Sequence, residues 1–266
     1  MIGVATIIIV MSVMNGFRDE LTSRLLGING HINIYSSQNQ IQIQSLNKIK
    51  TFDNKKFIYF PMIEVQALAI NKDISRGVFI RSYRNTDLQN KMSIKDNIIK
   101  GEIYSNNSNE IIIGYALANK LNLGIGNKLK IAIPKSDRTV FGNIPRFKTL
   151  VISGIFDLGM YEYDSNFIFS DPNISRKLLL INDDTFTNIE VMVEDFSYIE
   201  KYQKIIDEFL LDVDKNLYSL SWKENNISLL NALNVEKNVM FLILVLIILV
   251  ASMNIISGLI IFVKEK

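Results

Sequence analysis

The sequence contains no cysteine and one histidine, His31. Without cysteine the chain has no disulfide, no thiolate nucleophile and no cysteine-ligated zinc. A lone histidine at the start of a predicted strand forms neither a zinc site nor a catalytic dyad without partners, so we expect His31 to be structural or at the surface. The 29 Lys and Arg against 27 Asp and Glu give a formal net charge of +2, which indicates neither a nucleic-acid groove nor an acidic tail.

Two further catalytic signatures are missing. Residues 124–130, "GIGNKLK", carry glycines and a lysine but neither the spacing nor the Ser/Thr of a P-loop, so this chain does not hydrolyse ATP by that route. Residues 161–164, "YEYD", place two carboxylates close together, as glycosidases do, but we interpret them as a solvated turn. No nucleophile–base pair supports a membrane-anchored hydrolase.

Long apolar runs are present at both ends. Residues 239–263 form a run of 25 without a charge, which is long enough to cross a bilayer as a tilted helix. Lys264 and Lys266 follow it, and basic flanks favour the cytoplasm, so we place the preceding domain outside the cytoplasm. Polar and small residues within the run favour packing against another helix, although a single anchor also tolerates them; they are Ser252, Asn254, Ser257 and Gly258.

The opening run is shorter, with about 14 residues before Asn15 and Gly16. It is too short to span, and it lacks the basic leader and cleavage site of a signal peptide. The helical pattern continues through Phe17, Leu21 and Leu25, which predicts a helix that ends at Gly27 or Gly30. We therefore expect the chain to begin partway through a transmembrane helix, and both ends to be truncated.

The segment between the runs has a mixed α and β pattern. Two strand–helix–strand blocks are predicted to close into one split layer. The first has strands at 31–36, 57–70 and 75–84 with a helix at 40–52, and the second has strands at 187–195 and 216–222 with a helix at 196–213. Between them, residues 96–182 predict an inserted β-rich subdomain, with a helix on Leu117, Ala118 and Leu121 and strands at 128–133, 148–156 and 165–171.

One segment of this insert, residues 134–148, is predicted to be a loop too long for a tight hairpin. It carries basic residues with Phe141 and Phe147 among them, and Pro134 and Pro145 stiffen its arms. Such an arm suits docking to an acidic protein surface, because charge complementarity speeds and orients encounter. A solvated basic hairpin without a partner is the alternative.

Three separated blocks resemble the LolC/LolE family, the permease subunits of the lipoprotein-releasing ABC transporter. They are "SVMNGFRDELTSRLLGINGHI" at 12–32, "GNIPRFKTLVISGIFDLGMYEYDS" at 142–165 and "ALNVEKNVMFLILVLIILVASMNIISGLIIFVKEK" at 232–266. They occur in the family's order and cover nearly the whole chain. The wider group includes MacB-like mechanotransmitting permeases.

The resemblance implies an α+β periplasmic domain, a ferredoxin-like porter part with an inserted β-rich subdomain, flanked by transmembrane α-helices. The expected parts are the end of transmembrane helix 1 at 1–16, the porter halves at 17–95 and 183–236, the insert at 96–182, transmembrane helix 2 at 237–263 and the start of a cytoplasmic coupling segment at 264–266. It also implies that the chain is a fragment of a multi-pass inner-membrane protein, without the cytoplasmic leader and two later spans.

By the same resemblance, the protein extracts mature lipoproteins from the outer leaflet of the inner membrane and passes them to a periplasmic chaperone. The implied partners are an ATPase subunit, a second permease subunit in a homo- or heterodimer, the chaperone and the lipoprotein. No cofactor is expected in this chain, because ATP and Mg belong to the ATPase, and nucleic acid is not expected as a partner.

The resemblance also implies two sets of site residues. The acyl-chain cavity is assigned Met11, Met14, Phe17, Met240 and Phe241, where flexible methionines suit varied acyl chains; ordinary helix packing is the alternative. The chaperone-binding hook is assigned Lys130, Arg138, Arg146, Phe147 and Lys148. The alternatives for the whole protein are a MacB-like permease of efflux or signalling type, which lacks a chaperone-binding hook, and an anchored periplasmic binding or scaffold domain.

Overall fold

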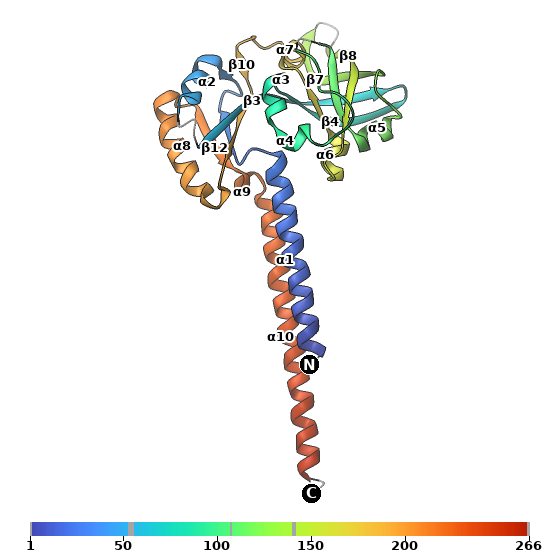
Figure 1. The fold of residues 1–266 in the computed structure, drawn as a ribbon, viewed down its shortest axis with the longest axis vertical. Coiled ribbons are helices and arrows are strands. Elements are labelled where there is room, and N and C mark those ends of the chain that lie inside the picture. The colour runs from blue at the N-terminus through green and yellow to red at the C-terminus, as the bar shows by residue number, and fades with distance from the viewer. Residues whose placement is uncertain (1, 53–55, 107, 140–141, 265–266) are drawn as a thin grey trace. The chain divides into compact units, whose positions relative to one another are not determined.

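The computed structural model describes residues 2–52, 56–106, 108–139 and 142–264. The chain divides into two compact units, a helical unit of Met1–Leu26 with Lys223–Lys266 and a domain unit of Gly27–Trp222. The helical unit holds two long helices, and the domain unit is a mixed α+β fold (Figure 1).

Helix α1 runs from Ile2 to Ile28 and helix α10 from Ile227 to Lys264. Helix α1 therefore ends between Gly27 and Gly30, as the pattern predicts. Among the described residues, α10 is the one helix long and apolar enough to cross a membrane, and none of its most apolar window is buried. An apolar surface all round a helix is the character of a membrane span rather than of a surface helix.

The first layer of the domain unit is a four-stranded antiparallel sheet in the order β12-β1-β11-β3. Its strands are β1 (Ile32–Ser36), β3 (Phe57–Asn71), β11 (Asn188–Val193) and β12 (Leu217–Ser221). Renumbered along the chain, this order is 4-1-3-2, with one helix in each strand–helix–strand block. The ferredoxin-like prediction is therefore confirmed.

Helices α2 (Ile43–Lys50) and α8 (Ile199–Val213) contact each other and cover one face of this sheet (Figure 1). Strand residues point alternately to opposite faces, so every second side chain meets the helices. The buried set on this side is Ile32, Ile34, Leu46, Ile49, Ile189, Val191, Ile206 and Leu210. A separate two-stranded pair joins β2 (Ile41–Gln42) to β10 (Thr185–Phe186).

The inserted part is a closed barrel. The strands are β3, β4 (Ile74–Ser82), β9 (Phe167–Ser170), β6 (Glu110–Gly114), β8 (Gly142–Phe156) and β7 (Lys128–Thr139). Each pairs with its two neighbours in that order, and β7 pairs back onto β3, so the sheet has no free edge at that point. Strand β5 (Ile98–Gly101) adds to β8.

The barrel interior is filled by alternate strand residues, mainly isoleucine, leucine and valine. Helices α5 (Tyr115–Leu121) and α7 (Pro172–Leu179) add Leu117, Leu121, Ile174 and Leu178 to this core. Helix α7 was not predicted from the sequence. Neither were the shorter helices α3 (Asn85–Asn90), α4 (Met92–Lys95) and α6 (Tyr161–Asn166), because segments of four to eight residues carry too little periodicity.

The boundary between the two parts lies inside β3. This strand pairs with β11 up to Met62 and with β4 from Ile63 onward. Sequence analysis places the boundary after residue 95, whereas the sheet changes partner here. The strand is mainly apolar on both sides of this point, with Glu64 and Gln66 shortly after it, and the sequence pattern did not predict the change of partner.

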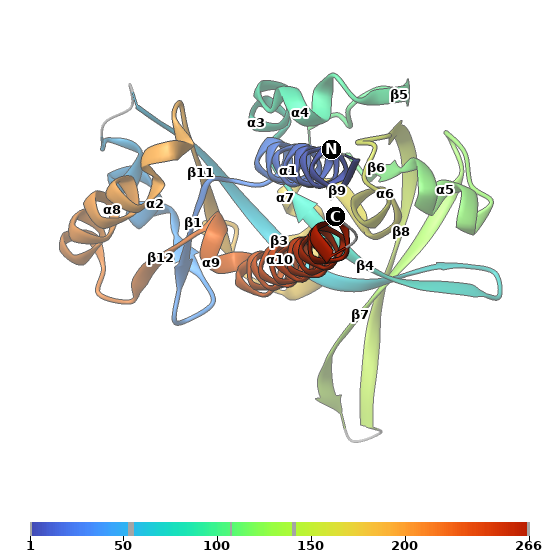
Figure 2. The ribbon, with the colours of Figure 1, turned by 90° about the horizontal axis from the view of Figure 1, so that it is seen from below.

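The segment 134–148 is not the long loop predicted from the sequence. Strands β7 and β8 stay paired as far as Thr139 and Gly142, and the hairpin extends away from the barrel (Figure 2). The register shifts between Ile133 and Asp137, next to Pro134, which has no N–H to donate to a ladder. Phe141 lies outside the described residues.

Candidate functional site

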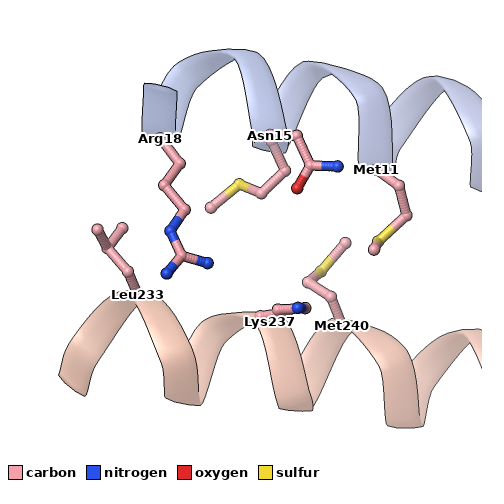
Figure 3. Close-up of a pocket in the computed structure, with 7 residues that line it drawn as sticks. Met11, Asn15, Arg18, Leu233, Lys237 and Met240 are labelled. Atoms are coloured by element: carbon pink, nitrogen blue, oxygen red, sulfur yellow. The ribbon is translucent and has the colours of Figure 1, made fainter. Parts of the chain in front are cut away.

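The helical unit has a small cavity between α1 and α10. Its walls are Met11, Met14, Asn15, Arg18, Leu233, Lys237 and Met240. Met11 and Met240 point toward each other from the two helices (Figure 3). The volume is about 20 Å³, which is room for one water molecule rather than an acyl chain.

Three of the five residues predicted for the acyl-chain cavity therefore lie together, namely Met11, Met14 and Met240. Phe17 and Phe241 are not among the residues that line this cavity, and their side chains are 54% and 64% exposed. Sequence reasoning missed the polar side of the cavity, where Arg18 donates a long hydrogen bond of 3.4 Å from Nη2 to Asn234 Oδ1. Charged residues at the end of an apolar run were the available signal.

The hairpin carries the predicted hook residues on two faces. Lys130 pairs across the ladder with Thr149, and Phe147 pairs with Ala132, so Lys130 and Phe147 share one face. The Lys130 Nζ lies 4.2 Å from the Phe147 ring centroid, a cation–π contact. Phe147 is 50% exposed.

Arg146 and Lys148 lie on the opposite face, toward α7. The Arg146 Nη1 donates a hydrogen bond of 3.0 Å to the carbonyl oxygen of Leu178 near the end of α7. Burial, with the Lys177 charge nearby, lowers the pKa of the half-buried Lys148. Arg138 lies in β7 and pairs with Asn143, and the structure does not describe its side chain. The predicted hook residues therefore differ in their surroundings. Lys130 and Phe147 form an exposed pair, whereas Arg146 bonds the hairpin to α7.

A buried charge cluster, which sequence reasoning missed, lies within the domain unit. The Lys91 Nζ donates hydrogen bonds to Glu190 Oε2, to the carbonyl oxygen of Ile28 at 2.8 Å and to Tyr83 Oη at 3.3 Å. Glu190 is 1% exposed and Lys91 is 3% exposed. A glutamate within the apolar strand "NIEVMV" was the available signal.

Arg81 extends the cluster. Its Nε donates to Glu64 Oε2 at 2.6 Å, and its Nη1 donates to Asn29 Oδ1 at 2.8 Å and lies 3.8 Å from Glu190 Oε1. Burial acts to raise the pKa of Glu190, but the Lys91 and Arg81 charges outweigh it and hold this pKa below its usual value. Gly30 allows the chain to pass here, since a Cβ at this position would lie 2.7 Å from the Glu190 Cβ.

Two other residues from the sequence analysis have structural roles. The His31 Nδ1 accepts a hydrogen bond of 3.0 Å from the Val193 N–H, which ties the residue before β1 to the end of β11, and burial lowers the pKa of this imidazole. The predicted solvated turn at 161–164 is wrong, because Asp164 in α6 is 4% exposed. Its two oxygens accept from the N–H groups of Leu158 and Met160, and burial raises its pKa to about 6.

The chain is similar along its whole length to transmembrane proteins of lipoprotein-releasing systems. Over its full length it is 29% identical to the lipoprotein-releasing system transmembrane protein LolC of Neisseria meningitidis serogroup B, of which it covers 64%, and 24% identical to LolE of Haemophilus influenzae, of which it also covers 64%. The predicted resemblance to the LolC/LolE family is therefore confirmed, and the chain spans slightly less than two thirds of these relatives.

Among solved structures, the extracellular domain of the noncanonical ABC-type transporter YknZ from Gram-positive bacteria superposes with a TM-score of 0.50. It is 11% identical and covers 71% of this chain and 99% of its own, so the likeness concerns the fold alone. A family model described as the MacB-like periplasmic core domain also matches the chain. Together with the apolar helix α10, this match indicates an inner-membrane protein with a periplasmic domain. Because that model matches residues 1–209, the chain belongs to the family of the MacB-like periplasmic core domain.

Proposed function

We propose that this chain is the periplasmic and membrane-entering part of a permease subunit that extracts mature lipoproteins from the outer leaflet of the inner membrane and passes them to a periplasmic chaperone. The observation that carries the proposal is the order of parts along the chain. A helix, a MacB-like core domain with a projecting hairpin and an apolar helix follow one another, and LolC relatives match 100% of the chain.

The substrate step is a transfer of apolar surface and forms no covalent bond. Each acyl CH₂ that leaves the bilayer for a protein surface is worth roughly 0.8 kcal/mol at each partition, so extraction requires an energy source. We assign that source to ATP and Mg on a separate ATPase subunit.

The acyl-chain surface requires a second permease subunit. The cavity of about 20 Å³ between α1 and α10 is too small for a chain, whereas Met11, Met14 and Met240 give it a flexible apolar wall. A second subunit, in a homo- or heterodimer, would enlarge this wall into a lipid-sized groove. Multi-pass insertion in the inner membrane, with the domain unit in the periplasm, belongs to the same proposal.

The chaperone is proposed to dock on the exposed face of the hairpin. Lys130 and Phe147 offer charge and aromatic surface, and they lie on the face of the hairpin opposite to Arg146, which donates to α7. Arg146 stabilises that contact instead, so variants of Arg146 would confuse loss of docking with loss of structure.

The test measures chaperone binding to the full chain in lipid nanodiscs. We expect Lys130→Glu with Phe147→Ser to abolish binding, while the matched charge reversal Lys95→Glu, at an exposed position on α4, leaves it unchanged. If the folded wild-type chain does not bind the chaperone, the handover proposal fails. The protein would then be either an efflux or signalling permease or a scaffold domain. Co-purification of the full-length protein with an ATPase subunit would indicate a permease, and its absence a scaffold domain.

A further inference from the structure

A pocket of about 300 Å³ lies on the domain unit between the start of α3 and the start of α7. Its lining is Arg84, Thr86, Asn106, Asp171, Pro172, Asn173 and Arg176. It contains neither the hook pair Lys130 and Phe147 nor the buried Lys91–Glu190 cluster. The α7 helix separates it from the hairpin, because Arg146 contacts Leu178 near the opposite end of that helix.

The two guanidinium groups that line this pocket lie near the same aromatic ring. The Cζ of Arg84 lies 5.5 Å and the Cζ of Arg176 lies 5.1 Å from the centroid of the buried Phe186 ring. Burial and the Arg84 charge lower the pKa of Arg176, and the charges of Asp183, Asp171 and Asp184 act against them. Like charges repel each other, and an anion bound in the pocket that both arginines line would offset that repulsion.

Arg176 is poorly satisfied within the chain. It is 9% exposed, its Nη1 and Nη2 donate only to Asn173 Oδ1 and the Thr185 carbonyl oxygen at 3.4 Å each, and its Nε has no hydrogen-bond partner among the described residues. A guanidinium has five donors, and buried donors left without acceptors are costly. Over the described part of the chain, no carboxylate lies at salt-bridge distance from Arg84 or Arg176.

The lining residues carry two positive charges, on Arg84 and Arg176, and one negative charge, on Asp171. The Asp183 and Asp184 charges act on Arg176 from outside the lining without a direct ion pair. Asp171 Oδ1 already accepts from the Asn173 N–H and caps α7. The hydroxyl of Thr86 and the amide of Asn106 can pair with neighbouring peptide groups.

We propose that this pocket binds the carboxylate of an aspartate or glutamate side chain on a peptide segment of a partner protein. Guanidinium groups bind carboxylates through paired hydrogen bonds, and a partly buried site strengthens them. A phosphate dianion fits less well because Asp171 lines the same pocket. The site adds a second contact surface to the domain unit, beyond the hook.

The test uses ligand-observed NMR on the full chain in nanodiscs, with three probes: acetyl-Gly-Asp-Gly-amide, its Asn counterpart and inorganic phosphate. We expect saturable binding of the Asp peptide only. Arg84→Gln should weaken it about tenfold, the loss expected for one charge-assisted hydrogen bond. Arg84 is exposed, so this variant keeps its fold, and the equally exposed Arg76→Gln on β4 should bind as wild type.

Arg176→Gln is the second variant, and its binding is measured only if thermal unfolding shows that the chain is folded. It should weaken binding of the Asp peptide at least as much as Arg84→Gln does. Three results would overturn the proposal: equal binding of the Asp and Asn peptides, phosphate binding without peptide binding, or unchanged peptide binding by Arg84→Gln.

Discussion

The Lys91 ammonium donates a hydrogen bond to the Glu190 carboxylate inside the domain unit, where both side chains are almost fully buried. Glu190 belongs to strand β11 of the ferredoxin-like layer, and Lys91 joins the helices α3 and α4 beside the barrel. The same ammonium holds the Ile28 carbonyl oxygen, so one buried charge fixes three segments that are distant in sequence.

Glu190→Gln should lower the free energy of unfolding by about 3–5 kcal/mol, because it leaves Lys91 buried without a counter-charge. Chemical denaturation of the full chain in detergent measures this. Glu208→Gln, at an exposed position on α8, is the matched control and should change stability by less than about 0.5 kcal/mol. The double variant Glu190→Gln, Lys91→Met should lose less than the sum of the two single variants, and strict additivity would contradict the pairing.

Asp164 should give the stability a distinctive pH dependence. Its pKa is raised from 3.8 to about 6 in the folded chain, so the folded state binds more protons than the unfolded state between these values. This contribution is complete below the unfolded pKa and is lost as the pH rises through about 6. The stability of wild type minus that of Asp164→Asn should therefore fall as the pH rises across this window, and a flat or rising difference would count against the assignment.

The edge strand β12 depends on a side chain of α8. Asp207 Oδ1 accepts from the Ser219 N–H at 3.2 Å and from the Ser219 hydroxyl at 2.6 Å, which covers a backbone donor at the sheet edge. Asp207→Ala should cost about 1–2 kcal/mol and increase self-association, because exposed strand edges pair with other chains. Light scattering and denaturation test this beside Asp212→Ala, an exposed aspartate on the same helix. Asp207→Ala behaving like the control would refute the role.

Arg146 and Phe147 should differ in how much they contribute to the stability of the hairpin. Arg146→Ala removes the hydrogen bond to the Leu178 carbonyl oxygen and should cost about 1 kcal/mol. Phe147→Ala, at a half-exposed position, should stay within about 0.5 kcal/mol of wild type. Thermal unfolding of the full chain distinguishes them, and the opposite ranking would mean that the exposed face, not the α7 contact, stabilises the hairpin.

Within α10, Asn254 is the polar side chain expected to contact another helix. The Ser252 hydroxyl already donates to the Leu249 carbonyl oxygen at 2.7 Å, and Ser257 donates to the Met253 carbonyl oxygen at 2.9 Å. Asn254→Leu should weaken helix association by roughly 1 kcal/mol, whereas Ser252→Ala should not. Energy transfer between labelled chains in liposomes measures the association. Equal effects of both substitutions would indicate that Asn254 faces lipid.

The sequence alone was enough to predict the elements that repeat a strong pattern. The apolar run at 239–263, the helix through Phe17 to its end near Gly27, and the two strand–helix–strand blocks all follow from periodicity and length, because these signals are local. The family resemblance rests likewise on contiguous blocks of sequence.

Only the tertiary structure determined which strands close the barrel, where β3 changes partner and which hook residues face outward. Each depends on pairing between residues far apart in the chain, which no local pattern encodes. The Lys91–Glu190 pair and the two arginines around Phe186 are of the same kind. From sequence alone, a charged residue is expected to be solvated, because burying an unpaired charge is costly. Only the tertiary structure shows that these residues are buried beside partners distant in sequence.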